Sequence, residues 1–260
     1  MRIVVLGTGN VGTQLSFALF EKGLGPGMVY NRHGDKAAAL ASRLGCAWTD
    51  DLHRLPTDAD LYICTLKDAA LEEVLQQIPD PGRGLWVHTS GSLPMTVLAP
   101  YARHYGVLYP LQTFSRERRV SFDRIPLCLE ASGGQEMKTL RQLAESLSQD
   151  VREMSSGQRA CMHLAAVFAC NFVNACYGVA GDVLAQGGLD FGLLLPLIEE
   201  TAAKVHDMAP DEAQTGPAVR GDGNITGRHL ALLDTWQRPE WAALYRQMSE
   251  LIYSRHNRQI

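Results

Sequence analysis

Short apolar runs alternate with segments of helical spacing along the first half of the chain. Residues 2–6 form a mostly apolar run that predicts a strand, and the apolar positions of residues 11–22 recur at helical intervals. Asp35 is the expected N-cap of a second helix. Repetition of such units predicts an α/β fold with a Rossmann-type, doubly wound and mainly parallel sheet. Further strands are expected at 28–30, 47–48, 61–66 and 84–89, and helices at 35–44 and from Asp68 onward.

The pattern changes character near Ser155. Before it, strands are expected at 107–109, 126–130 and 151–154 and a helix at 135–147, which extend the same sheet. After it no strand pattern remains, and helices are expected at 157–186, 192–208, 225–233 and 240–255. The segment 157–186 is apolar nearly all round, which is typical of a central, buried helix. We therefore expect an α/β domain over residues 1–154 and an all-helical domain over residues 155–260.

Composition and charge exclude several classes of protein. The chain has 260 residues and a formal net charge of −4, so it lacks the basic excess that generic nucleic-acid binding requires. The most apolar stretch, residues 160–183, is interrupted by His163, Asn171, Asn174 and Asp182, which argues against a membrane span. The six cysteines show no metal-binding spacing. We therefore expect a cytoplasmic protein whose thiols are free and buried. We expect neither a metal site nor a signal peptide.

A glycine-rich loop follows the first expected strand and opens the first expected helix. It reads Gly7, Thr8, Gly9, Asn10, Val11, Gly12, a GxGxxG motif in the context that dinucleotide binding requires. Gly7 permits the tight turn, Gly9 leaves the backbone open to a pyrophosphate, and Gly12 lets the helix pack closely on the strand. Free amides of the first helical turn then face the anion. A purely structural glycine turn is the alternative.

The end of the second expected strand indicates which dinucleotide is preferred. The ribose-reading residue is expected about 20 positions beyond the motif, which reaches Asn31. No acidic residue stands there, and Arg32 follows at once; its guanidinium matches a phosphate bidentately. The cofactor is therefore expected to be NADP(H). In the alternative interpretation Arg32 is a solvated loop residue and Asp35 binds the ribose.

Polar residues follow the next strands, where ligands of parallel sheets bind. Leu66 and Lys67 lie at the end of the strand expected at 61–66 and are expected to border the cofactor, together with Thr89 and Ser90. Ser90, Gly91 and Ser92 are also expected to hold a substrate carbonyl or carboxyl, with Ser90 among the catalytic candidates. An ordinary Ser/Gly turn is the alternative. The segment at the following strand end is expected to add a wall to the site with Gln112 as a polar contact, unless it has no role in the site.

The long helix carries an imidazole and two amides on one face. With 100° per residue, Asn174 projects at about 20° and Asn171 at about 80° from His163. We expect His163 to act as a general acid, with Asn171 beside it and Asn174 contacting the substrate. Alternatively, these groups satisfy one another within a helical core. Arg220 lies in the late glycine-rich loop and is expected to bind an anion, unless that loop only connects two helices.

Together these segments resemble a bacterial family. Its members pair a Rossmann-like NADP-binding domain with a C-terminal helical domain of undefined function, and they are labelled NADP oxidoreductases of the deazaflavin-dependent type. The resemblance spans nearly the whole chain and is most specific in the Pro-Leu-Gln-Thr-Phe stretch at 110–114 and the loop at 215–222. It implies a helical domain like that of 6-phosphogluconate dehydrogenase, with similarity to pyrroline-carboxylate and ketopantoate reductases and a homodimer through that domain.

Two positions depart from the relatives' patterns. Where ketopantoate reductases carry Lys-x3-Asn-x3-Asn, this chain has His163, Val167 and Asn171, and Tyr109 replaces the histidine that usually precedes Pro-Leu-Gln. We therefore expect an NADPH-dependent reductase of a small carbonyl or imine, with His163 or a bound water supplying the proton. A non-catalytic NADP(H) sensor is the alternative. A deazaflavin:NADP oxidoreductase is a third possibility.

Overall fold

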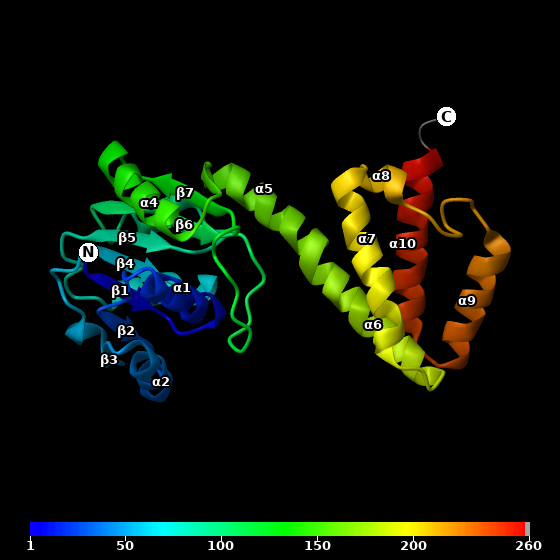
Figure 1. Cartoon of the computed structure of the whole chain (residues 1–260), viewed down its shortest axis with the longest axis horizontal. Coiled ribbons are helices and arrows are strands. Elements are labelled where there is room, and N and C mark those ends of the chain that lie inside the picture. Colours follow the sequence, from blue (N-terminus) through cyan, green and yellow to red (C-terminus); the bar gives the residue numbers. More distant parts are fainter. Residues whose placement is uncertain (258–260) are drawn as a thin grey trace. The chain divides into compact units, whose positions relative to one another are not determined.

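The computed structural model describes residues 1–257, and the chain forms two compact units. The first runs from Met1 to Asn171 and the second begins at Phe172. The last strand ends at Glu153 and the next helix begins at Ser156, so the change in pattern near Ser155 coincides with the end of the sheet (Figure 1). A functional division at that residue stays a prediction.

The first unit is built on one eight-stranded sheet, in the order β3-β2-β1-β4-β5-β6-β7-β8. All neighbouring pairs are parallel except β6 and β7. This confirms the predicted Rossmann-type, doubly wound and mainly parallel sheet. The strands are β1 (Ile3–Leu6), β2 (Met28–Tyr30), β3 (Ala47–Thr49), β4 (Leu61–Cys64), β5 (Leu85–His88), β6 (His104–Pro110), β7 (Leu127–Ala131) and β8 (Val151–Glu153).

Helices cover both faces of the sheet, and alternate strand residues enter separate cores. Ile3 and Val5 of β1 belong to one apolar cluster, and Val4 and Leu6 belong to another, as the two-residue period of a strand requires. In the second cluster the Trp86 ring stacks on Tyr62. The elements on the two faces are α1 (Asn10–Glu21), α2 (Gly34–Leu44), α3 (Asp68–Gln76) and α4 (Gly134–Leu147), with short 3-10 turns at Leu52–Arg54 and Met95–Leu98.

The start of α2 differs from the expectation. His33 occupies the N-cap position and its side chain makes no cap, while Asp35 lies in the first turn of the helix. The prediction that Asp35 is the N-cap is therefore wrong. A carboxylate within the first turn still stabilises a helix through its dipole, which is why the sequence signal pointed to this place.

The long apolar helix is continuous but not uniform. It consists of α5 (Ser156–Ala166), a π-helical segment η3 (Val167–Phe172) and α6 (Val173–Gln186). A capping box of Ser155 and Gln158 starts α5. A π-helix bonds residue i to i+5, so the 100° step that grouped His163 with Asn171 and Asn174 does not hold through η3.

The expectation that this helix is buried is wrong for the single chain. Leu164 and Phe168 are both 60% exposed. Contrary to the expectation from its polar residues, Ser156–Gln186 is long and apolar enough by length and composition to cross a membrane, although one such helix is weak evidence. An apolar pattern on all sides indicates that a helix is buried, but it does not show whether the same chain or another molecule buries it.

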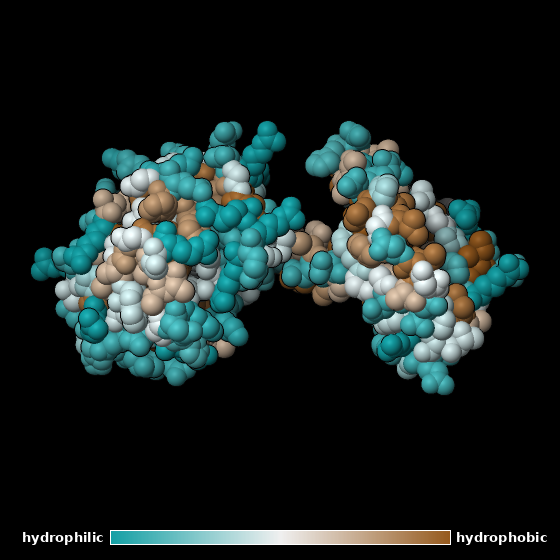
Figure 2. Space-filling model, turned by 60° about the horizontal axis from the view of Figure 1, so that its bottom comes forward, coloured by the Kyte–Doolittle hydropathy of each residue, from teal (hydrophilic) through white to brown (hydrophobic). Residues whose placement is uncertain are grey.

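The second unit, as far as residue 257, is helical. Leu233, Trp241 and Ala242 form its small buried cluster, against which Val179 and Val183 of α6 pack. The expected helices are present, and Figure 2 shows many apolar residues at the surface of this unit. After α6 come η4 (Phe191–Leu194), α7 (Leu195–Asp207), α8 (Pro210–Ala213), α9 (Gly223–Thr235) and α10 (Pro239–Asn257).

The six cysteines are free, as expected, but not all are buried. Cys64 and Cys128 lie in the sheet and are buried, whereas Cys161 and Cys176 on the long helix are exposed. The prediction of burial is wrong for these two because it followed from apolar neighbours in the sequence, and those neighbours are exposed as well.

Candidate functional site

The glycine loop has the geometry of a ligand cradle. Gly7 has a φ of 108°, a conformation that favours glycine, and its N–H donates to the Tyr30 carbonyl at 2.8 Å. A Cβ at Gly7 would lie 2.7 Å from Oγ1 of Thr65. A Cβ at Gly12 would overlap the Gly7 carbonyl, whereas one at Gly9 would meet nothing within 4 Å. Gly7 and Gly12 thus serve packing, and Gly9 leaves the cradle open.

This cradle fits the diphosphate of a dinucleotide. Gly9 occupies the N-cap position of α1 and has no side chain to cap the helix. The first-turn amides therefore have no intrahelical acceptors and are available to an anion. No acidic side chain stands in that turn to repel the anion.

Several side chains of the cradle are already engaged within the protein. Nδ2 of Asn10 donates to the Phe114 carbonyl at 2.8 Å, and Nδ2 of Asn31 donates to Oγ1 of Thr8 at 2.7 Å. Arg32 is exposed and forms no ion pair within residues 1–257. Asn31 therefore shapes the loop, whereas the Arg32 guanidinium is available to a ligand.

The loop after β5 is held by its own hydrogen bonds. Oγ of Ser90 donates to Asp68 at 2.9 Å and accepts from the N–H groups of Ser92 and Leu93 at 3.1 and 3.0 Å. The Ser90 hydroxyl is thus occupied in the loop, and its expected roles stay predictions. Thr89 donates its N–H to the Cys64 carbonyl at 3.2 Å, which joins the ends of β4 and β5.

His88, the last residue of β5, forms a hydrogen bond with the same loop. The ring is buried, and its Nδ1 accepts from the Ser90 N–H at 3.1 Å. Burial and then the Arg159 charge lower the pKa of His88 to about 4, so the ring is neutral at physiological pH. Because Nδ1 accepts, the proton of the neutral ring lies on Nε2.

Arg159 is a site residue that the sequence interpretation missed. Its side chain is fully buried; Nε donates to the Ser90 carbonyl at 3.2 Å and Nη2 donates to the Leu93 carbonyl at 2.6 Å. Nη1 donates to the Glu130 carboxylate, which also accepts from Ser156. Desolvation raises the pKa of Glu130, but the hydrogen bonds from Arg159 and Ser156 outweigh it and leave the pKa lowered. A lone arginine in an apolar helix was the available signal.

One turn after Arg159, His163 lies against the same loop. A Cβ at Gly91 would lie 2.6 Å from Cγ and Nδ1 of the imidazole, so only glycine permits this approach. Nδ1 of His163 is 3.1 Å from the Tyr109 hydroxyl, and the two rings meet edge to face. The structure thus places His163 directly against Gly91, where a substrate between the two was expected, and adds Tyr109.

The remaining predicted residues do not join this group. Gln112 is exposed, and its Oε1 accepts from the neighbouring Thr113 N–H at 2.8 Å. Asn171 ends the first unit in the π-helical segment, whereas Asn174 and Arg220 belong to the second unit. Lys67 is exposed before α3, and Leu66 is half-buried in the second core. The roles of these residues stay predictions.

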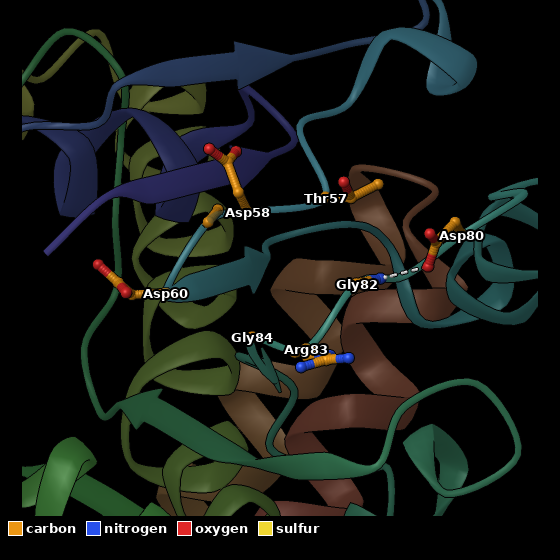
Figure 3. Close-up of a pocket in the computed structure, with 8 residues that line it drawn as sticks. Thr57, Asp58, Asp60, Asp80, Gly82, Arg83 and Gly84 are labelled. Atoms are coloured by element: carbon orange, nitrogen blue, oxygen red, sulfur yellow. Dashed lines mark hydrogen bonds between the residues drawn. The ribbon is translucent and has the colours of Figure 1, made fainter.

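A pocket of about 710 Å³ lies at the opposite edge of the sheet, before β4 and β5 begin (Figure 3). Its acidic residues have local partners: Asp58 pairs with Arg2, Asp60 accepts the Arg2 N–H, and Asp80 accepts the Gly82 N–H. Residues 1–257 contain no His/Cys/Asp/Glu group suited to a metal ion. The pocket is therefore no part of the site.

Comparison with known proteins identifies the family. A family of coenzyme F420-dependent NADP oxidoreductases matches residues 2–87, and a domain of unknown function (DUF2520) matches residues 125–252. A candidate NADP oxidoreductase from Bacteroides fragilis is 44% identical over 97% of this chain and 98% of that one, with a TM-score of 0.93. The chain belongs to this family of NADP oxidoreductases. No protein among those with curated functions matches it.

Two more distant structures share the fold of this NADP oxidoreductase. A pyrroline-5-carboxylate reductase from Coxiella burnetii is 18% identical, with a TM-score of 0.59, over 99% of this chain and 97% of that one. An imine reductase from Myxococcus stipitatus, in complex with NADP+, is 16% identical, with a TM-score of 0.63, over 98% and 92%. The expected family, the oxidoreductase class and the NADP(H) cofactor are thus confirmed.

Proposed function

We propose that this protein uses NADPH to reduce a small molecule at a carbonyl or imine bond. The observation that carries the proposal is the imidazole of His163, held against Gly91 at the edge of the sheet that also bears the glycine cradle. In the order β1-β4-β5-β6 the cradle follows β1 and the Gly91 loop follows β5, with β4 between them and about 5 Å between neighbouring strands. The pyrroline-carboxylate and imine reductases of similar fold support the substrate class.

The cofactor residues follow from the cradle. The first-turn amides of α1 bind the diphosphate, and Arg32 pairs with the 2′-phosphate that distinguishes NADP from NAD. Leu66, Lys67 and Thr89 border the nicotinamide half. When bound, the reduced nicotinamide supplies hydride, and the residues around it orient the two reactants and exclude water.

His163 supplies the proton that reduction requires. Its Nε2 has no hydrogen-bond partner within the first unit, so this nitrogen is free to face a substrate. Gly91 and Ser92 bind the substrate beside it, with Asn171 close to the reacting group. Gln112 adds a polar contact from the same unit, and Asn174 and Arg220 are candidate substrate ligands of the second unit.

The protein acts as a cytoplasmic homodimer, without a membrane or nucleic-acid partner. A second copy of the chain would bury apolar side chains that are exposed in a single chain. Examples are Leu164 and Phe168 on the long helix and Leu193 and Leu197 in the second unit. Polar groups within the long helix argue against lipid. Sedimentation analysis is expected to give twice the mass of 28.5 kDa; a monomer would contradict the dimer.

The cofactor assignment is tested by calorimetry with NADPH and NADH. Arg32→Ala is expected to weaken NADPH binding about tenfold, because an exposed charge-assisted pair is lost, and to leave NADH unchanged. Lys36→Ala, a nearby exposed cation one turn along α2, is the matched control. An unchanged NADPH-to-NADH ratio in Arg32→Ala would refute the role of Arg32.

The reaction is tested by following nicotinamide absorbance with cyclic imines and small keto acids. Turnover that falls about 100-fold in His163→Ala, with NADPH affinity unchanged, is the expected result. Tight NADPH binding without turnover of any substrate would instead favour the non-catalytic sensor. Oxidation of a reduced deazaflavin by NADP alone would favour the third possibility.

A further inference from the structure

The hydroxyl of Tyr109 has a single hydrogen-bond partner within the described part of the chain, Nδ1 of His163. The tyrosine is 9% exposed and packs with Val107 and Cys128, so its ring cannot turn to another acceptor. Burial raises the pKa of the phenol, so the hydroxyl keeps its hydrogen. A buried hydroxyl needs an acceptor. When the imidazole is neutral, the Tyr109 hydrogen is therefore donated to Nδ1.

Two contacts hold the imidazole of His163, and a third fixes the helix turn before it. Tyr109 meets the ring edge on, with 6.0 Å between the ring centroids and 81° between their planes. Gly91 supports one ring face, because a Cβ there would overlap Cγ and Nδ1. Arg159 fixes the preceding turn of α5 to the carbonyls of Ser90 and Leu93. Nδ1 is thus engaged, and Nε2 has no hydrogen-bond partner within residues 1–257.

We propose that Tyr109 is a positioning residue that fixes the orientation of His163 and places the proton of the neutral imidazole on Nε2. This proposal rests on the proposed function, in which His163 is the proton donor. In the imidazolium form, Nδ1–H donates to the Tyr109 oxygen instead, because a hydroxyl both donates and accepts. Nε2 thus carries a proton in the neutral ring as well as in the cation.

The proton balance of the reduction follows. When the substrate carbon accepts hydride from NADPH, the π pair of the C=O or C=N bond moves to oxygen or nitrogen. That atom takes the Nε2 proton of the imidazolium, and the ring becomes neutral while NADP+ remains. The Tyr109 oxygen accepts from Nδ1–H throughout the transfer and keeps its own hydrogen. The neutral ring is left with its proton on Nδ1. Solvent returns a proton to Nε2, and loss of the Nδ1 proton to solvent restores the neutral ring in which Nδ1 accepts from Tyr109.

The first test needs neither cofactor nor turnover. In protein with 15N-labelled histidine, the ring-nitrogen shifts distinguish the two neutral tautomers. The His163 signal is assigned among the eight histidines by its loss in His163→Gln. We expect the Nε2–H tautomer in the native protein and a mixture in Tyr109→Phe, which removes one oxygen atom and keeps the ring. An identical tautomer in Tyr109→Phe would overturn the proposal.

A matched control comes from the same strand. Tyr105 of β6 makes no side-chain hydrogen bond to any histidine within residues 1–257. Tyr105→Phe therefore deletes the same atom without touching His163. It is expected to leave the His163 signal and the turnover unchanged. A change in His163 equal to that of Tyr109→Phe would show a general effect of the strand and would contradict the proposal.

The second test asks whether Tyr109 acts through His163. Tyr109→Phe is expected to lower kcat about tenfold, the scale of one hydrogen bond, with little change in the KM for NADPH. In a His163→Ala background the same substitution is expected to cause no further loss, because the group it positions is absent. A full tenfold loss in that background would overturn the proposal. If the tautomer changes in Tyr109→Phe but the native protein turns over no substrate, the positioning role of Tyr109 stands and the proposed reductase activity is refuted.

Discussion

Replacing Arg159 with methionine tests the anchor that holds the β5 loop to the long helix. Methionine keeps much of the volume and removes the charge and the donors. The carbonyls of Ser90 and Leu93 lose their partners, and the Glu130 carboxylate loses its cation. The Arg159 side chain is fully buried and that of Glu130 is 18% exposed, so water replaces little of what is lost. The first unit is therefore expected to be strongly destabilised.

The magnitude follows from these contacts. Breaking a buried pair by removing one partner costs ~3–5 kcal/mol. Ser156 still donates to both Glu130 oxygens, through its N–H at 3.0 Å and its hydroxyl at 2.7 Å, which places Arg159→Met at the lower end. At ~2–4 °C per kcal/mol for a unit of this size, a loss of ~3 kcal/mol lowers Tm by about 6–12 °C.

The measurement is urea and thermal unfolding followed by tryptophan fluorescence, with Trp86 reporting on the first unit. Arg152→Met is the matched control, because Arg152 is 61% exposed and pairs with Asp150 at the surface. It is expected to cost less than ~0.5 kcal/mol. Equal and small effects of the two substitutions would refute the reasoning that burial makes Arg159 an anchor.

Three further predictions concern pH, the cradle and a helix cap. The pKa of His88 is about 4 in the fold against an ordinary 6.5, so the unfolded chain takes up the proton first as the pH falls. Stability is thus full above pH 6.5 and falls by ~3 kcal/mol toward pH 4, as urea unfolding at several pH values should show; His88→Asn should flatten this dependence. Gly9→Ala should fold normally but weaken NADPH binding in calorimetry, whereas Gly12→Ala, whose Cβ overlaps the Gly7 carbonyl, should also lower Tm. Asp222→Ala should cost ~1 kcal/mol in urea unfolding, because Asp222 accepts the Ile225 N–H at the start of α9; an unchanged midpoint would contradict this cap.

Much of the first unit was predictable because its signals are local. Strand and helix periods and the glycine spacing of residues 7–12 each depend on a few neighbouring residues. The same holds for the absence of an acid at Asn31, which favoured NADP. Such signals survive folding because backbone conformation and the face of each element follow from short-range sterics and apolar burial.

The group around His163 was only partly predictable. His163 and Gly91 were both assigned to the substrate site from the sequence, Gly91 because it follows an expected strand and His163 because it lies on the polar face of the long helix. The partnership with Tyr109 joins residues 54 positions apart, and the Arg159 anchor spans 69 positions to Ser90. No spacing rule relates residues that far apart, so Tyr109 registered only as a departure from relatives and Arg159 went unnoticed.

The sequence by itself determined the architecture of the sheet, the place of the cofactor cradle and the helical character of the second unit. Only the tertiary structure decided which side chains meet at the edge of the sheet, that a π-helical segment interrupts the long helix, and that this helix is exposed in one chain. The physical reason is that periodicity records which face of an element must be covered, whereas strand order and close approach decide what covers it.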